Sequence, residues 1–270
     1  MDLIVFGPLS VNVAVLVSLA LSVRLAGRHA GTPPRRALAM MGVLAVCTLV
    51  GGRLHYILNH PTAYSGRWLL TLKLWEGGFH LPGGIVALMV LAPVVCRRFG
   101  ISAGRFGDAI TPAITFGIAI SRLGCTIAGC CTGEVCTAPW CVAFPAGTSV
   151  YGMHRHLSLI PEGAARSLPV LPLQIGFLVV ALGLTAFAVW LQRHKRYDGQ
   201  AALATMFLFA ASTAVLEPFR GYVPEQQYWG PLPRLAWEAL GLAIVCGLTL
   251  LVAELRHRRS LRHGVVATPA

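Results

Sequence analysis

The chain of 270 residues is 56% hydrophobic and only 12% charged, and its mean hydropathy is +0.68. A soluble domain carries about 25% charged residues, so this composition excludes a soluble globular protein and predicts one that spans a lipid bilayer. The 22 Lys and Arg residues exceed the 10 Asp and Glu residues, and we interpret the net charge of +12 as basic loops that face anionic lipid headgroups. Because no soluble basic domain is visible, we expect no nucleic-acid partner.

Charge-poor stretches of about 20 residues predict the membrane-spanning helices, because a helix of that length crosses the hydrocarbon core. They predict an all-α polytopic membrane protein, a bundle of about seven transmembrane helices. Asp2 and no basic residue precede the first span, so we expect it to be retained and not cleaved as a signal peptide. The predicted spans are 4–23, 37–58, 77–96, 109–121 (ending at Arg122), 167–192, 199–216 and 235–253.

The basic residues predict the orientation of the chain. Of the 22 Lys and Arg residues, 14 follow the first, third, fifth and seventh predicted spans. Cytoplasmic loops carry such an excess, so we expect the N-terminus outside and the C-terminus in the cytoplasm. We therefore predict a single transmembrane domain over residues 1–255, with an extracytoplasmic cysteine-rich loop at 125–166, and a basic cytoplasmic tail at 256–270.

Three arginines lie within or at the ends of predicted spans, where an ionisable side chain costs about 2.5–3.5 kcal/mol. Arg53, Arg122 and Arg220 all approach the predicted outer face of the membrane. Each alone is compatible with a side chain that extends to the headgroups or pairs with Glu217 or Glu134. Together they predict a pocket for a phospholipid headgroup, because a guanidinium stays charged and can bind two oxygens of one phosphate at once.

Two glycine pairs flank Pro82 where the third predicted span begins. Such a run is not typical of a helix interior, so residues 77–84 predict a helix break or a re-entrant start at membrane depth. Close packing of small residues between two helices is the alternative.

Five of the eight cysteines fall within 17 residues of the predicted extracytoplasmic loop. That compartment permits disulfides, so we predict two bridges and one free thiol, and the spacing does not fix which cysteines pair. We favour disulfides over a zinc site, because there is no C-x-x-C pair and His154 and His156 follow well downstream, and we assign no metal and no cofactor. The five are Cys125, Cys130, Cys131, Cys136 and Cys141.

The order of these motifs resembles that of the prolipoprotein diacylglyceryl transferases, seven-span bacterial enzymes. Residues 121–133 are similar to the family signature G-R-x-G-N-x-x-N-G-E-x-x-G and keep Arg122, Gly124, Gly129 and Gly133. A cysteine-bearing variant of the signature, G-R-x-G-C-x-x-x-G-C-C, fits these residues better. Residues 52–56, 172–174 and 217–220 resemble the G-R-L-G-Y, P-S-Q and E-F-F-R elements of the family.

The resemblance implies transfer of the diacylglyceryl group of phosphatidylglycerol to the lipobox cysteine of a prolipoprotein signal peptide, with release of glycerol phosphate. It implies a multi-pass protein of the bacterial cytoplasmic (inner) membrane. The reaction needs a base and a fixed positive charge, and we assign these roles to His80 and Arg122. The implied substrate-binding residues are Arg53, Gly83, Gly84, Gly124, Gly129, Gly133, Gln174 and Arg220.

Two departures from the family pattern keep alternatives open. Pro82 stands where the family's H-G-G element has its His, so His80 is the substitute, and Thr213 stands at the family's second essential Arg. One alternative is therefore a catalytically degenerate homologue that binds lipid or resembles a transporter. The cysteines suggest a second, a membrane thiol-redox protein, although such enzymes usually present a C-x-x-C pair.

Overall fold

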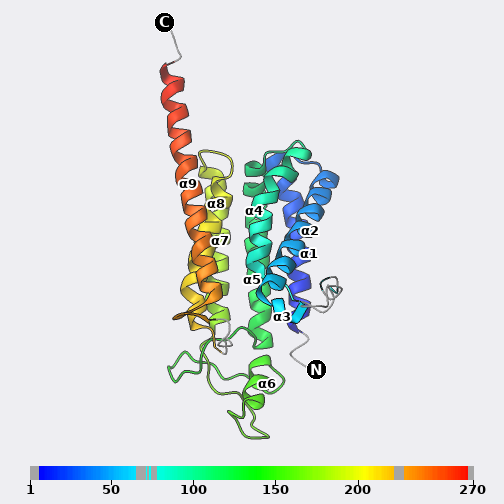
Figure 1. Cartoon of the computed structure of the whole chain (residues 1–270), viewed down its shortest axis with the longest axis vertical. Helices are drawn as coiled ribbons and strands as arrows, with labels where there is room; N and C mark the ends of the chain where they lie inside the picture. The colour runs from blue at the N-terminus through cyan, green and yellow to red at the C-terminus, as the bar shows by residue number, and fades with distance from the viewer. Residues whose placement is uncertain (1–5, 65–70, 72, 74–77, 222–227, 267–270) are drawn as a thin grey trace. The chain divides into compact units, whose positions relative to one another are not determined.

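The structure, a computed structural model, describes residues 6–64, 71, 73, 78–221 and 228–266. The described residues are mainly helical, and seven of the described helices are long and apolar enough to cross a membrane, which confirms the predicted fold class (Figure 1). The helices are α1 (Phe6–Ala30), α2 (Pro34–Asn59), α3 (Pro61–Tyr64), α4 (Leu81–Arg98), α5 (Ala103–Ala128), α6 (Ser149–His156), α7 (Leu173–His194), α8 (Gln200–Leu216), the 3-10 turn η4 (Glu217–Phe219) and α9 (Arg234–Val266).

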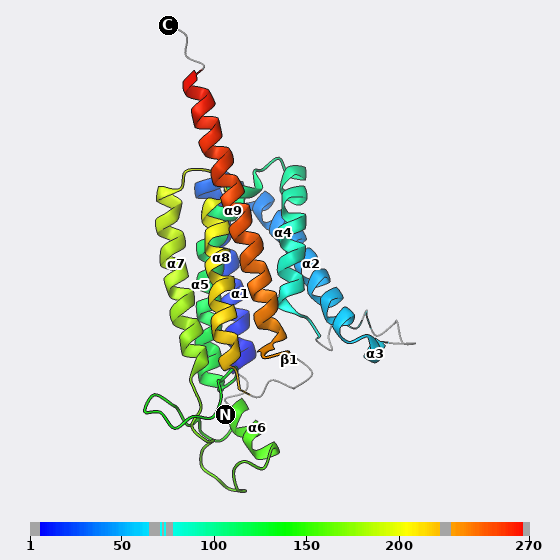
Figure 2. The same cartoon turned by 60° about the vertical axis from the view of Figure 1, so that its left-hand side comes forward.

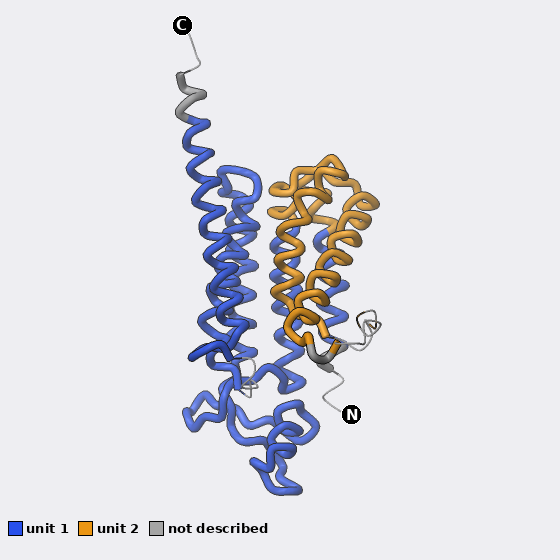
Figure 3. The backbone as a smooth tube through the Cα atoms, in the orientation of Figure 1, with its two compact units in different colours: residues 1–22, 110–270 blue, residues 23–109 orange. Residues whose placement is uncertain are grey.

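The chain divides into two compact units, residues 23–109 and residues 1–22 with 110–270 (Figure 3). In the unit of residues 23–109, α2 packs along α4. In the other unit α7, α8 and α9 lie side by side, and the Thr185 hydroxyl of α7 donates to that of Thr115 in α5 at 3.0 Å (Figures 1 and 2). The hairpin of β1 (Tyr228–Trp229) and β2 (Leu232–Pro233) precedes α9.

Several helix boundaries differ from those predicted, and α5, α7 and α9 show the physical reasons. Helix α5 covers residues 103–128 and not 109–121, because it accommodates both charges that bounded the apolar stretch: Asp108 is buried, and Arg122 rests on an aromatic ring of α7. Helix α7 begins at Leu173, since the residues before it run extended and Val170 pairs with Val142. Helix α9 continues through the predicted tail as far as Val266.

The segment between α5 and α7, residues 129–172, has a small core of its own. Phe144, Val150 and Val170 are buried together, and Met153 of α6 packs against them. In Figures 1 and 2 this loop lies beyond the last turn of α5 and the first turn of α7, at the end of the unit where α9 begins. The loop is thus a folded cap on one end of the helices of its own unit.

Candidate functional site

The last turn of α5 folds the chain back on itself. Gly129 follows the helix with φ +62°, and the Cys130 amide donates to the Cys125 carbonyl at 3.2 Å. This is the Schellman arrangement, in which a glycine in the left-handed region lets the next residue bond back to the helix. The turn brings the Cys130 side chain next to that of Cys125.

Cys131 completes a group of three thiols, which we call the thiol cluster. The Sγ atoms of Cys125, Cys130 and Cys131 all lie within 4.8 Å of one another, and each side chain is half-buried. Cys131 has φ +56°, a backbone conformation that residues other than glycine rarely adopt. The turn and this conformation together fix the three sulfurs.

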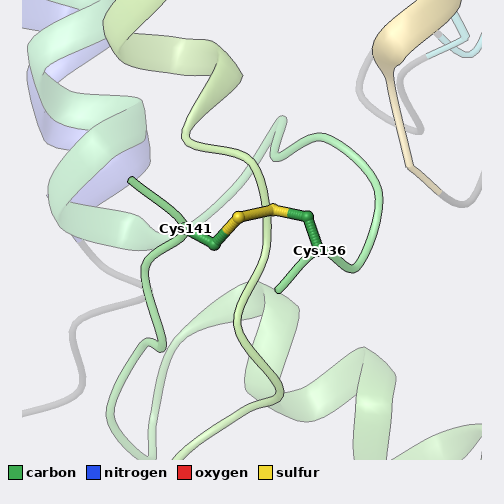
Figure 4. The surroundings of a disulfide bond; sticks show 2 residues. All are labelled: Cys136 and Cys141. Atoms are coloured by element: carbon green, nitrogen blue, oxygen red, sulfur yellow. A yellow bond between two sulfur atoms is a disulfide. The ribbon is translucent and has the colours of Figure 1, made fainter. Parts of the chain in front are cut away.

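The prediction of two disulfides is wrong for the described cysteines. One bridge joins Cys136 to Cys141 within the loop, as Figure 4 shows. All three members of the thiol cluster are free thiols. Sequence spacing alone could not separate the bridged pair from the cluster.

The surroundings favour ionisation of one particular thiol. Hydrogen bonds from the Cys125 and Cys130 thiols, with the charges of Arg220 and Arg122, hold the pKa of Cys131 below its usual value against the opposing effect of burial. The pKa of Cys130 is raised, because its thiol hydrogen-bonds to the other two sulfurs and is buried beside them. Among the three thiols, these surroundings therefore favour the ionised form of Cys131 most.

Arg122 lies in α5 one turn before Cys125. Its guanidinium sits over the Phe177 ring of α7, with 4.7 Å between Cζ and the ring centroid. Within the described part of the chain this guanidinium has no hydrogen-bond acceptor and no carboxylate in contact. A fixed positive charge with its donors available is the feature that an anion-binding site requires.

Gln174 presents a second polar group without a partner. Its side chain is fully buried in the first turn of α7, and neither its amide nitrogen nor its amide oxygen has a hydrogen-bond partner among the described residues. Gln174 and Phe177 are three residues apart, so they lie on the same face of α7. An unpaired buried amide costs about 1–3 kcal/mol, which makes it a candidate to bind a ligand.

Arg220 lies immediately after η4 and pairs with a buried carboxylate. Its Nε is 2.7 Å from Oε1 of Glu217, which is only 3% exposed. The other oxygen of Glu217 has no hydrogen-bond partner among the described residues. Arg122 and Arg220 both act electrostatically on Glu217 and on Cys131, so we call Arg122, Gln174, Glu217 and Arg220 the arginine site.

Gly133 connects the loop to the backbone at Arg220. The two residues form an antiparallel bridge, and the Gly133 amide donates to the Leu171 carbonyl at 2.8 Å. A Cβ at Gly133 would lie 2.8 Å from the Leu171 Cβ and from the Phe219 carbonyl. Only glycine fits there, so Gly133 holds the loop against the arginine site.

Arg53 belongs to the unit of residues 23–109, and its guanidinium binds backbone carbonyls. Its buried guanidinium donates to the carbonyls of Thr71, Lys73 and Gly78 at 3.2–3.3 Å. The Tyr64 ring lies 5.5 Å from its Cζ. This arginine therefore holds the described residues Thr71, Lys73 and Gly78, which precede α4.

His80 lies at the start of α4. Its amide donates to the Gly52 carbonyl of α2 at 3.0 Å, and its Nδ1 is 3.5 Å from the Asn59 amide nitrogen. Three rings contact the imidazole edge-on, with centroids 5.1–5.6 Å away: those of His55, Tyr56 and His60.

The helix break or re-entrant start that was predicted for residues 77–84 does not fall at Gly83 and Gly84. Both residues lie in the first turn of α4, which begins at Leu81. A Cβ at Gly83 would lie 2.6 Å from the Gly51 carbonyl oxygen, and one at Gly84 would lie 2.9 Å from the Thr48 side chain. The glycines allow α2 and α4 to approach closely, as expected from the alternative of close packing of small residues between two helices.

Gly124 lies on the face of α5 toward α1. Any side chain there would collide with Ser10. Beside this position is a groove of about 180 Å³ with mainly apolar walls, lined by Leu9, Ser10, Val13, Ile120, Leu123, Gly124 and Ile127.

The sequence model of the prolipoprotein diacylglyceryl transferases matches residues 4–256. The chain belongs to this family. It is 26% identical over 216 residues to the phosphatidylglycerol–prolipoprotein diacylglyceryl transferase of Wolbachia pipientis subsp. Culex pipiens, with 77% of each chain covered. The enzymes of that name from Legionella pneumophila (strain Paris) and Geobacter sulfurreducens are 33% identical over 185 residues and 35% identical over 129 residues.

The chain spans 62% of the length of the Legionella relative and 48% of the Geobacter relative, which correspond to 65% and 47% of this chain. Membership in the prolipoprotein diacylglyceryl transferase family favours neither the transporter nor the thiol-redox alternative. It also identifies the chain as a multi-pass membrane protein, in agreement with the seven apolar helices.

The predicted site residues of this prolipoprotein diacylglyceryl transferase homologue fall into two sets. One unit holds those around the arginine site: Gly124, Arg122, Gly129, Gly133, Gln174 and Arg220. The other unit holds Arg53, His80, Gly83 and Gly84. Sequence reasoning did not identify Phe177, although its position three residues after Gln174 could have indicated it.

Proposed function

We propose that this chain transfers the diacylglyceryl group of phosphatidylglycerol to the lipobox cysteine of a prolipoprotein signal peptide, in the bacterial inner membrane. The observation that carries the proposal is Arg122, a guanidinium fixed on the Phe177 ring with no acceptor among the described residues. The unpaired Gln174 amide on the same face of α7 adds a neutral donor and acceptor. A phosphate diester next to fatty-acid esters is the ligand that matches this combination.

The reaction is a displacement by sulfur. The acceptor sulfur forms a bond to the terminal glyceryl carbon, the bond from that carbon to the phosphate oxygen breaks, and glycerol phosphate leaves with the electron pair. Negative charge grows on the leaving phosphate, so Arg122 stabilises the transition state more than the ground state. We assign the acceptor proton to His80, the imidazole at the start of α4.

The other predicted residues take supporting roles in this proposal. Gln174 donates its amide to an ester carbonyl of the lipid, and Arg220, oriented by Glu217, holds the remaining headgroup oxygens. The apolar groove at Gly124 accepts part of an acyl chain. Arg53 positions His80 through the segment before α4, to which its guanidinium is bonded.

The test is transfer in proteoliposomes that contain phosphatidylglycerol and a prolipoprotein with a lipobox cysteine. The proposal predicts a diacylglyceryl mass increase on the acceptor and an equal amount of released glycerol phosphate. The matched control for Arg122→Ala is Arg155→Ala, because Arg155 lies in the loop and, among the described residues, pairs only with the exposed Glu162 at 3.7 Å. Lipid binding without transfer by the wild-type protein would establish the degenerate lipid-binding homologue instead.

A further inference from the structure

The thiol cluster is a ready set of metal ligands. The Sγ atoms of Cys125, Cys130 and Cys131 lie within 4.8 Å of one another. Tetrahedral zinc with Zn–S bonds of about 2.3 Å requires sulfurs about 3.8 Å apart. The sulfurs therefore need to approach one another by at most about 1 Å to bind one ion.

The backbone that presents the thiols is constrained. Gly129 adopts φ +62°, and a Cβ on it would lie 2.8 Å from the Thr148 Cβ, so the turn after α5 is packed against α6. The bridged pair Cys136–Cys141 lies elsewhere in the same loop and leaves the three thiols unbonded. A disulfide would use two of these thiols and leave the third, whereas a metal ion uses all three.

The charged side chains around the thiol cluster suit a metal–thiolate complex with a net charge of minus one. Arg122 and Arg220 both act on the cluster, and Glu217 pairs with one of them. Two guanidinium groups and one carboxylate carry a net charge of plus one. Three thiolates around a divalent ion carry minus one, so the occupied site is neutral as a whole, which burial requires.

We propose that Cys125, Cys130 and Cys131 bind one Zn²⁺ ion through three thiolates, and that the fourth position binds the acceptor thiol of the transfer reaction. Soft thiolate ligands select zinc over hard cations. Among the described residues, no fourth His, Cys, Asp or Glu joins the group. Three protein ligands with one open position are typical of catalytic zinc sites and not of structural ones.

The role of the fourth position rests on the proposed function, whereas the metal site itself does not. An incoming thiol displaces water from the ion and loses its proton to solvent or to a base, and the zinc stays divalent throughout. The bound sulfur is then a thiolate, because a metal ion lowers the pKa of a coordinated thiol.

The experiment is metal binding by the purified full-length protein in detergent. We expect about one equivalent of Zn²⁺ and, with Co²⁺ in its place, the intense visible bands of a tetrahedral thiolate complex. Cys131→Ser should weaken the affinity more than about 100-fold, because even an outer-shell substitution costs about 10–100-fold. The matched control Cys47→Ala, a half-buried thiol in α2, should bind the metal as the wild type does.

A measurement on the wild-type protein covers the case in which a variant fails to fold. Bound Zn²⁺ should protect Cys125, Cys130 and Cys131 from alkylation, and a chelator should expose all three together, as read by mass spectrometry of the peptides. Equal labelling with and without Zn²⁺, or binding that Cys131→Ser leaves unchanged, overturns the metal site.

Two further readouts separate this inference from the proposed function. Addition of a short thiol peptide should shift the Co²⁺ bands if the fourth position takes a thiol, and unchanged bands overturn that role. Transferase activity that survives complete zinc removal also overturns that role while leaving the transferase proposal intact. Zinc binding with band shifts but no transfer refutes the proposed function and leaves the metal site standing.

Discussion

Replacement of Arg122 by alanine is the most direct test of the arginine site. The guanidinium rests on Phe177 at 4.7 Å and has no acceptor among the described residues, so its donors are available to a bound phosphate. Two charge-assisted hydrogen bonds contribute about 1.5–3 kcal/mol each. We therefore expect kcat/KM for phosphatidylglycerol to fall by about 10²–10⁴-fold, since each 1.4 kcal/mol of lost transition-state stabilisation is about a factor of ten.

The assay is glycerol phosphate release from phosphatidylglycerol vesicles at saturating acceptor. Stability should change little, because the substitution removes a single cation–π pair with Phe177, which contributes about 0.5–2 kcal/mol. Arg122→Lys keeps the charge but not the planar pair of donors, so its activity should lie between those of the wild type and the alanine variant. Full activity in Arg122→Ala would refute the role of this residue as the phosphate ligand.

Four other predictions follow from the same structure. Arg53→Ala should lower the free energy of unfolding by about 3 kcal/mol or more, measured by thermal unfolding in detergent, because three carbonyls lose a charged donor; an unchanged unfolding temperature would contradict this. Gln174→Leu should reduce activity about tenfold or more and leave stability equal or higher, because it removes an amide that is unpaired in the free protein; unchanged activity would show that the amide does not touch lipid. Gly129→Ala should destabilise by about 1–2 kcal/mol or more, since φ is +62°, and should speed alkylation of the thiol cluster. Burial lowers the pKa of His154 from 6.5, so the stability that its neutral ring contributes is complete above pH 6.5 and is lost as the pH falls toward the lowered pKa. The Leu168 amide donates to this ring, so the hydrogen-exchange rate of that amide should rise over the same pH range. The rate should not rise in His154→Gln.

Hydropathy located the seven spans because a bilayer forces each crossing segment to satisfy its own backbone hydrogen bonds as a helix. The helix ends were less predictable, and α5 shows why. Asp108 and Arg122 bounded the apolar stretch, yet the helix extends past both because each charged side chain is buried or covered by its surroundings. A window of sequence reports apolar content, whereas the fold determines where a charge is tolerated.

The site shows the same division between local and tertiary information. Motif positions pointed to Arg122 and Gln174, and each lies in a setting that suits a ligand. The thiol cluster was not predicted, because cysteines were considered as pairs along the sequence. Gly129 between Cys125 and Cys130 carried the missing signal, since a glycine just after a helix predicts a turn that brings these two residues together.

The same turn explains how a chain of this family can place thiols where the family signature has Asn and Glu. The signature of the prolipoprotein diacylglyceryl transferases has Asn at the position of Cys125 and Glu at the position of Cys130, and this chain keeps the glycine between them. A Schellman turn depends on that glycine and not on its neighbours, and in this chain it brings two thiols together. Oxygen ligands suit hard cations and hydrogen-bond donors, whereas sulfur ligands suit zinc. The phosphate-binding role of Arg122, one turn earlier on α5, does not depend on this exchange, so the metal site and the transferase proposal stand or fall separately, whereas the role of the fourth zinc position rests on the transferase proposal.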